Sequence, residues 1–264
     1  MKDFTLLSYE QLLCKIGPRD CTLLHYLTNN DNEYIIRHDV DKSLGQALKM
    51  AMIESQYEIK SSYYFRVKPN LFNKDIINKI YILGHEIGYH YEVMDKAKGD
   101  LISAEKLFRE EWSLFKEWNS KTVAMHGNPL TIYNNLDFWK NNKLSDYEVT
   151  GEAYLSVDFD TIKYFTDTGR GWNTSVSFKD KGNKLLIKID NTSNLIEYIN
   201  TTEDRYYIMT HPQYWSDNFI IWIKIKFLES IKNIIKKIIK NNIIFNKPFY
   251  ALGELGARLM KKYA

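Results

Sequence analysis

Short strand-like runs alternate with amphipathic helical runs along this chain, and this alternation restricts the fold more than any other feature. We expect strands at residues 34–39, 60–67, 85–90 and 122–125, separated by helices at residues 43–57, 73–83 and 103–118. Strands separated by helices of this length form parallel βαβ units. The pattern loosens after residue 130, with further strands expected at residues 163–166, 185–189 and 206–210 and a helix at residues 194–200. We therefore predict one α/β domain, built as a barrel.

Length and composition agree with this class of fold. A chain of 264 residues suits a single α/β barrel, and 44% hydrophobic with 26% charged residues is typical of a soluble globular protein. Two cysteines, Cys14 and Cys21, are too few for a disulfide framework. We find neither a secretory signal nor an apolar run long enough to span a membrane, so we expect a cytoplasmic protein.

Ionisable residues cluster where the expected strands end. In a parallel α/β barrel all strand carboxyl ends lie at one face, which is where active sites are built. Asp39 and Asp41 are two residues apart, so in extended backbone their side chains face the same side. Histidines follow or precede four strand ends, namely His38, His90, His126 and His211. We expect these groups to converge on one rim.

Such a set of side chains suits metal-assisted hydrolysis. Carboxylate and neutral imidazole are good ligands for zinc and related divalent ions. One aspartate can bind the ion while the other acts as a base, and a histidine opposite can protonate the leaving group. The competing interpretation is a salt-bridged strand end, in which Arg37 and Lys42 neutralise Asp39 and Asp41.

The order of these motifs resembles the polysaccharide deacetylases of carbohydrate esterase family 4. The resemblance rests on residues 37–41 (RHDVD), residues 84–90 (GHEIGYH) and a late hydrophobic strand that ends at His211. Residues 125–129 (MHGNP), 166–172 (TDTGRGW) and 210–215 (THPQYW) are similar to a divergent branch of that family associated with the biosynthesis of surface glycans such as lipopolysaccharide. The resemblance covers about residues 33–215.

The resemblance implies a distorted (β/α) barrel that uses a divalent metal to remove acetyl groups from N-acetylated sugars. Zinc is the expected ion, with cobalt, nickel or manganese as alternatives. In the family's motif order, Asp39 is the general base and His211 the general acid. Asp41 and His90 are metal ligands. Asp167 and Arg170 belong to the motif that orients and supports the catalytic groups.

One departure from the family pattern concerns the metal. The family places a second histidine four residues after the first, where this chain has Met94, and a thioether is a poor ligand for such an ion. Glu92 is our first candidate for the missing ligand. The second is His126, which stands where the family has an active-site arginine.

Two alternatives to a sugar deacetylase remain open. One is a barrel that has lost catalysis and serves as a glycan-binding or scaffold protein, and the other is a metal hydrolase of another amide or ester. Aromatic residues near the motifs, Tyr91, Trp172 and Trp215, are candidates for stacking on sugar in either glycan-related case.

The C-terminal part of the chain differs in charge from the rest. We divide the chain into a deacetylase-like domain at residues 1–218 and a basic helical segment at residues 219–264. From Ile220 onward the sequence has ten Lys and Arg residues and two acidic residues, a net charge of +8. Because the whole chain has a net charge of +3, residues 1–219 carry −5. Residues 219–242 predict one amphipathic helix with an apolar face made of Ile221, Ile225, Leu228, Ile231, Ile235 and Ile238.

Three interpretations of this helix compete. It packs on the barrel, it forms an oligomer contact, or it lies on an anionic membrane, which would place the protein at the periphery of the inner membrane. The expected partner of the barrel is an N-acetylated sugar or glycan precursor. No nucleic-acid-binding motif is present and the main body is acidic, so nucleic acid is not expected.

Overall fold

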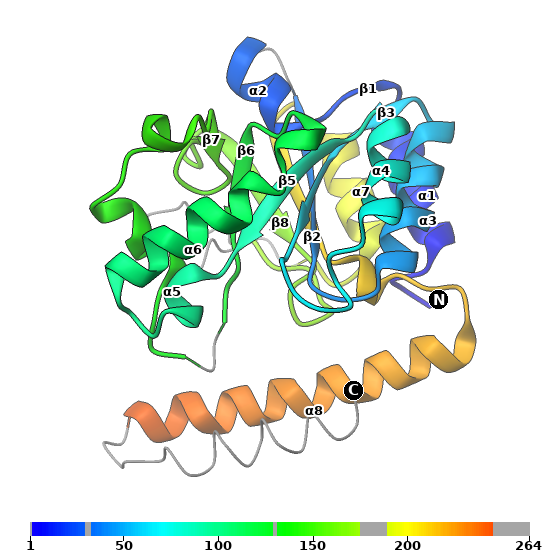
Figure 1. The fold of residues 1–264 in the computed structure, drawn as a ribbon. Coiled ribbons are helices and arrows are strands. Elements are labelled where there is room, and N and C mark those ends of the chain that lie inside the picture. The colour runs from blue at the N-terminus through cyan, green and yellow to red at the C-terminus, as the bar shows by residue number, and fades with distance from the viewer. Residues whose placement is uncertain (1, 30–32, 129–130, 175–188, 245–264) are drawn as a thin grey trace.

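The structure is a computed structural model that describes residues 2–29, 33–128, 131–174 and 189–244 (Figure 1). Most of the strand expected at residues 185–189 lies outside these ranges, as do residues 245–264 of the expected C-terminal segment.

Seven parallel strands form one curled sheet in the order β7-β6-β5-β4-β2-β9-β8. The strands are β2 (Tyr34–Val40), β4 (Ser62–Phe65), β5 (Glu86–Tyr91), β6 (Thr122–Met125), β7 (Gly151–Glu152), β8 (Ile162–Thr166) and β9 (Arg205–Thr210). Strands β1 (Arg19–Asp20) and β3 (Ile59–Lys60) pair separately. Within the described residues the edge strands β7 and β8 do not pair with each other. The α/β prediction is confirmed, and over the described residues the sheet is a curled half-barrel, which is consistent with a distorted barrel.

Helices flank this sheet. They are α1 (Leu6–Ile16), α2 (Leu23–Asn29), α3 (Leu44–Gln56), α4 (Lys74–Ile82), α5 (Val93–Lys96), α6 (Leu101–Ser113), α7 (Thr192–Thr201) and α8 (Phe219–Ile244), with short 3₁₀ turns η1 (Lys116–Trp118), η2 (Asn135–Lys140), η3 (Leu144–Tyr147) and η4 (Pro212–Tyr214). Helices α1, α3, α4 and α7 lie together on one side of the sheet, and α8 lies below the body, which it contacts through Trp222 and Glu229 (Figure 1).

Local sequence explains where helix α4 begins and ends. The side chain of Asn73 accepts a hydrogen bond from the backbone N–H of Ile76, which satisfies one of the free donors of the first turn. At the other end Gly84 has a φ of 94°, a left-handed conformation that glycine adopts without strain. The chain then enters β5 directly, so this helix sets the starting point of the strand that carries His90.

The concave face of the sheet is filled by side chains. Tyr64 lies across Gly88 on the next strand, where a Cβ atom would overlap the Tyr64 ring and lie 2.9 Å from the carbonyl oxygen of Thr122. Beside it Arg37 is fully buried, with its guanidinium 4.4 Å from the ring centre of Tyr154 and 3.4 Å from the hydroxyl of Tyr207. These side chains form a packed floor beneath the carboxyl ends of the strands.

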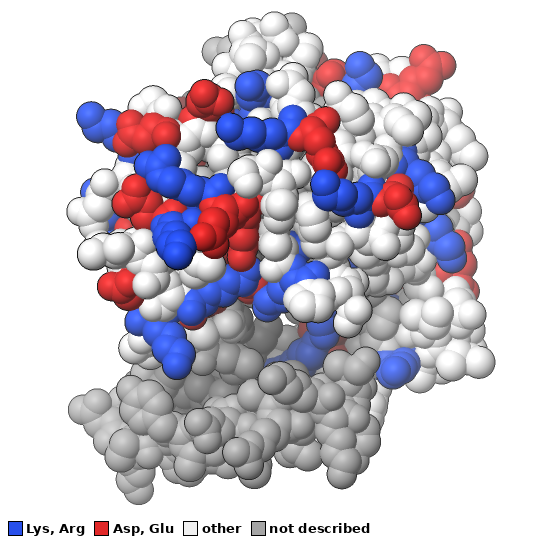
Figure 2. Space-filling model, viewed as in Figure 1, with Lys and Arg blue, Asp and Glu red and all other residues white. Residues whose placement is uncertain are grey.

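The surface of the body is mixed in charge. The face shown in Figure 2 carries Lys and Arg side by side with Asp and Glu rather than a broad patch of one sign. Such a face lacks the continuous positive stripe that accompanies binding of a nucleic-acid backbone. Among the helices of the described ranges, none has both the length and the apolar character needed to cross a bilayer.

Candidate metal and catalytic site

The carboxyl ends of the central strands bring the predicted residues together. Asp39 lies near the end of β2 and Asp41 follows that strand, while His90 is on β5, His126 follows β6 and His211 follows β9. Polar side-chain atoms of His90, His126 and His211 all lie within 4 Å of Asp41. The predicted convergence holds for Asp39, Asp41, His90, His126 and His211. It is wrong for His38, whose ring is buried on the other side of β2 and pairs with Glu54, because successive residues of a strand point to opposite faces.

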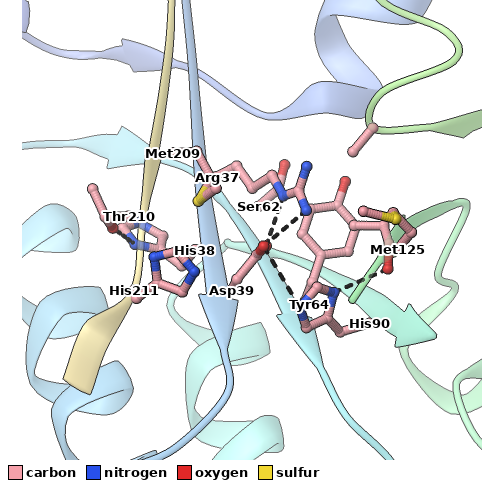
Figure 3. A network of polar contacts seen from close by, with 12 residues as sticks. Arg37, His38, Asp39, Ser62, Tyr64, His90, Met125, Met209, Thr210 and His211 are labelled. Atoms are coloured by element: carbon pink, nitrogen blue, oxygen red, sulfur yellow. Dashed lines mark hydrogen bonds and ion pairs between the residues drawn. The ribbon is translucent and has the colours of Figure 1, made fainter. Parts of the chain in front are cut away.

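Asp39 is held between a cation and an imidazole. Both of its oxygens accept hydrogen bonds from Arg37, at 2.6 Å from Nε and 2.8 Å from the terminal nitrogen. Its Oδ2 also lies 3.6 Å from Nε2 of His90 (Figure 3). Burial alone would raise the pKa of Asp39, but Arg37, His90 and His211 outweigh it and lower that pKa below its ordinary value. Asp39 is therefore a fixed, ionised carboxylate at neutral pH.

Asp41 differs from Asp39 in having a buried oxygen without a hydrogen bond. Its Oδ1 atom is sheltered from solvent and accepts none, yet it lies 3.4 Å from Nε2 of His90 and 3.4 Å from Nε2 of His126. Arg66 is slightly farther, at 3.6 Å. Burial would raise the pKa of Asp41, but His126, His90 and His211 lower it well below its ordinary value. A charged, sheltered oxygen of this kind requires a partner.

The distances from Asp41 to the two histidines suit ligands of one ion. Oxygen and nitrogen ligands about 2.0–2.2 Å from a tetrahedral zinc lie about 3.3–3.6 Å from one another. The two separations of 3.4 Å from Asp41 Oδ1 to the histidine nitrogens fall in that range. Asp41 therefore lies at ligand spacing from each of the two histidines, and His126 offers a nitrogen where Met94 does not, while the described group whose three ligand atoms all lie within 4.8 Å of one another is Glu92, Asp95 and His126.

The orientation of His90 supports the same conclusion. Its Nδ1 lies 3.0 Å from the carbonyl oxygen of Ala124, and because a carbonyl only accepts, Nδ1 carries the proton. Its Nε2 then faces the carboxylates of Asp39 and Asp41, which requires either a second proton or a cation between them. A backbone carbonyl that fixes the far nitrogen is the usual outer support of a metal-binding histidine.

His126 is held in the neutral form that binds metals. Burial lowers its pKa, the neighbouring His90 and Arg66 lower it further, and these effects outweigh the attraction of Asp41, leaving the pKa at about 4. At neutral pH its ring therefore carries a free lone pair. One nitrogen faces Asp41, and Nδ1 lies 3.6 Å from Glu92.

Glu92, the other predicted ligand, is already paired with cations. Arg66 donates to its carboxylate, Lys68 lies 3.1 Å from Oε1 and Lys96 lies 3.6 Å away. One carboxylate oxygen of Glu92, one of Asp95 and one ring nitrogen of His126 nevertheless all lie within 4.8 Å of one another, and these three residues form a second set of candidate ligands. Met94 is buried in the core on α5 and does not face the rim. Of the two candidates, His126 is the one with a free nitrogen next to Asp41.

His211 forms a supported pair with Asp167. Its Nδ1 lies 2.6 Å from Asp167 Oδ1, and its backbone N–H also donates to this carboxylate. The indole N–H of Trp215 donates to the other oxygen at 2.9 Å. Burial alone would lower the pKa of His211, but Asp167, Asp41 and Asp39 outweigh it and raise the pKa to about 9. The ring is thus a protonated donor at neutral pH, with Nε2 3.9 Å from Asp41.

Arg170, predicted as a supporting residue, lies elsewhere. Its guanidinium sits 4.5 Å from the ring centre of Trp222 on α8, and it lines a cavity of about 320 Å³ between α8 and the body, beside Asp3 and Glu229. It contacts Asp167 through the backbone, where its N–H donates to the Asp167 carbonyl. Arg170 shapes the turn after β8 and does not reach the rim.

The three aromatic residues suggested as sugar platforms are buried in the core. Tyr91 is inaccessible and shares hydrogen bonds with Glu152 and Trp139, and Trp215 is equally buried beside Asp167. Trp172 is 7% exposed and donates to Thr192. This corrects the expectation from sequence, since none of these rings has a free face for a sugar to stack on.

One residue of the rim was not predicted. Arg66 directly follows β4 and bridges Asp41 and Glu92. Its position at a strand end is the same signal that identified Asp41 and His126, and applying that rule to β4 would have found it.

Comparison with known proteins adds no relative to this picture: no family model, curated protein or solved structure matches the chain.

Proposed function

We propose that this protein is a metal-dependent hydrolase that removes the acetyl group of an N-acetylated sugar or glycan precursor, in the biosynthesis of a surface polysaccharide. The observation that carries the metal-dependent part is the sheltered Oδ1 of Asp41, 3.4 Å from the Nε2 atoms of His90 and His126 and without a hydrogen bond. The substrate class rests on the resemblance of the motifs described above to the polysaccharide deacetylases.

Asp41, His90 and His126 would hold the ion. A divalent ion in such a site supplies Lewis acidity, polarising a carbonyl oxygen and making hydroxide available near neutral pH. The ring of His90 contributes orientation because Ala124 fixes its far nitrogen. The exposed edge of the site is Asp41, whose side chain is 20% accessible, so substrate would enter there.

Asp39 would accept the proton of the attacking water. Arg37 fixes both of its oxygens, which holds the carboxylate in one orientation beside His90. The same pairing lowers the pKa of Asp39, so the group is ionised and available at neutral pH, although it is a weaker base than a free carboxylate.

His211 would protonate the leaving amine. Its ring is tethered by Asp167 on one nitrogen, and the other nitrogen faces the rim near Asp41. With a pKa of about 9 the ring carries the required proton at neutral pH. Asp39 and His211 thus flank Asp41 as a deprotonated and a protonated group, which is the pairing that hydrolysis of an amide needs.

A second candidate function is a glycan-binding barrel without catalysis. The bidentate contact of Arg37 with Asp39 favours it, because it satisfies that carboxylate as a structural salt bridge would. For a salt-bridged strand end we predicted Lys42 as the partner of Asp41. In the structure the guanidinium of Arg66 lies 3.6 Å from Asp41.

Metal content separates the two functions. The protein is purified without a metal-chelating tag, and bound metals are measured by elemental analysis beside Asp41→Ala and His90→Ala. We expect near-stoichiometric zinc, or cobalt, nickel or manganese, that both variants lose. Release of acetate from N-acetylated sugars is then followed in the metal-loaded protein and in Asp39→Asn. If the wild-type protein binds no metal after incubation with these ions, the hydrolase proposal fails and the binding function takes its place.

A further inference from the structure

Helix α8 turns a polar side toward the body. Trp222 donates its indole N–H to the carbonyl oxygen of Asp3, Glu229 accepts from the hydroxyl of Tyr214, and Asn233 donates to the carbonyl oxygen of Gly169. Of the apolar residues on this helix, Ile225 packs against the core. The contacts to the body are therefore made mainly through hydrogen bonds, which is the reverse of an ordinary amphipathic helix on a globular domain.

The opposite side of α8 carries a row of exposed apolar side chains. Counting from Ile220, they stand at positions i, i+3, i+7, i+11 and i+14, a spacing that places them on one face of a helix. Their exposed fractions are large, at 78% for Ile220, 45% for Ile223, 65% for Phe227, 39% for Ile231 and 59% for Ile234. We call these five residues the apolar stripe. The predicted apolar face shares only Ile231 with it among the described side chains.

Cations accompany the stripe. Lys224 is exposed on the turn after Ile220 and borders the stripe, whereas Lys226, also exposed, lies 5.0 Å from the ring centre of Trp222 on the side toward the body. From Ile220 onward the chain carries ten basic and two acidic residues. A row of aliphatic and aromatic side chains in a basic segment suits an anionic membrane surface. The apolar residues enter the acyl boundary, and the lysine and arginine side chains of the segment reach the lipid phosphates.

The position of α8 gives this surface a direction. Gly169 follows β8 and Tyr214 follows β9, so the helix lies below the carboxyl ends of the strands, on the same side of the molecule as the candidate site (Figure 1). A membrane that binds the apolar stripe would thus face the end of the sheet where Asp41 is accessible.

We propose that α8 is a membrane-docking helix that binds an anionic lipid surface through the apolar stripe formed by Ile220, Ile223, Phe227, Ile231 and Ile234. Binding does not depend on the proposed hydrolase activity, since no residue of the rim takes part. The occupant is a lipid surface rather than a second copy of the chain, because the residues from Ile220 onward carry a net charge of +8, which would repel itself across a symmetric contact.

Vesicle flotation of the full chain tests this proposal. Vesicles of phosphatidylcholine with phosphatidylglycerol are compared with vesicles of phosphatidylcholine alone, at low and high salt. We expect binding to the anionic vesicles that weakens as salt rises, and much weaker binding to the neutral ones. The double variant Ile220→Asp/Phe227→Asp should lower the affinity for anionic vesicles by about tenfold or more, because it places two negative charges on the face of the helix that enters the membrane.

A matched control distinguishes the stripe from apolar exposure in general. Ile82 and Ile102 are 80% and 82% exposed and lie on α4 and α6, so Ile82→Asp/Ile102→Asp introduces the same charges elsewhere and should bind vesicles as the wild type does. Circular dichroism verifies that both variants fold. Absence of wild-type binding at low salt, or equal binding by the stripe variant, overturns the proposal. So does a wild-type dimer that does not bind vesicles and becomes monomeric in the stripe variant.

Discussion

The imidazole of His211 and the carboxylate of Asp167 form one unit, with Nδ1 and Oδ1 2.6 Å apart and the backbone N–H of His211 donating to the same carboxylate. The two residues come from the ends of neighbouring strands, β9 and β8. A ring tied at one nitrogen presents the other in a fixed direction, which is the arrangement that orients a histidine in proton transfer.

Replacing Asp167 with Asn should weaken this unit. The pKa of His211 is raised to about 9 because Asp167 and the aspartates of the rim outweigh burial, so removing the charge of Asp167 lowers that pKa. If His211 acts as an acid, turnover is lost as pH rises through the pKa of His211. In Asp167→Asn the alkaline limb of the pH–activity profile should therefore move to lower pH than in the wild type. We expect kcat to fall by about 10²–10⁴. A pH profile of acetate release checks this, with the exposed Asp158→Asn as a control; an unchanged alkaline limb would contradict the assignment.

Metal affinity should distinguish the two possible sets of ligands. His126→Ala removes a nitrogen 3.4 Å from Asp41, so zinc affinity should fall about 100-fold or more. Glu92→Gln removes a carboxylate that three cations already balance, so the loss should be about tenfold at most, the size of an outer-sphere effect. Calorimetric titration with zinc measures both. A larger loss in Glu92→Gln, shared by Asp95→Asn, would place the ion in the group formed with Asp95.

Glu54 should stabilise the fold in a pH-dependent way. This inaccessible residue of α3 accepts hydrogen bonds from His38, Ser61 and Tyr63 at 2.6–2.7 Å, and from Tyr9. Burial alone would raise its pKa, but His38 and the other donors outweigh it and lower the pKa to about 2. Because the folded value is lower than the unfolded one, the stabilisation is complete above about pH 4.5 and is lost as pH falls toward 2.

Glu54→Gln tests this network. The variant should lose on the order of 3 kcal/mol of unfolding free energy at pH 7, and the difference from wild type should shrink as pH falls from about 4.5 to about 2. Urea unfolding at several pH values measures it, with the exposed Glu58→Gln for comparison. A difference that does not change over this range would show that the ionised form of Glu54 is not what stabilises the fold.

Gly88→Ala should destabilise the sheet. An added methyl group would overlap the ring of Tyr64 and approach the Thr122 carbonyl oxygen to 2.9 Å, and this backbone atom is fixed by the strand. We expect a loss of about 1–3 kcal/mol. Gly45→Ala on α3 is the matched control, because nothing lies within 4 Å of its added methyl group and alanine favours a helix by up to about 1 kcal/mol. Thermal unfolding of both variants gives the comparison, and equal stability of the two would contradict the packing argument.

Much of the fold was predictable because strands and helices alternate with clear spacing. Strand β6 has the bounds expected from sequence, and β2, β5, β8 and β9 differ by one residue at one or both ends. The convergence of Asp39, Asp41, His90 and His211 was also predictable, since parallel strands place their carboxyl ends at one edge. The edge of the sheet at β7 was not, because this two-residue strand has no signal of its own in the sequence.

The errors concern burial. Tyr91 and Trp215 stand beside the strand-end motifs, and sequence position alone does not show whether an aromatic ring faces solvent or the core. The orientation of α8 was left open between packing on the barrel, an oligomer contact and an anionic membrane. In the structure Trp222, Glu229 and Asn233 meet the body through hydrogen bonds.

The packed floor under the rim limits the path by which a molecule can reach and leave Asp41. Arg37, Tyr64, Tyr154 and Tyr207 close the space beneath Asp39, and all four are at most 4% exposed. Among the described residues the half-barrel is therefore closed on this side of Asp41. Under the proposed function, substrate and product would enter and leave by the same side, where α8 lies, so one product would have to depart before the next substrate binds.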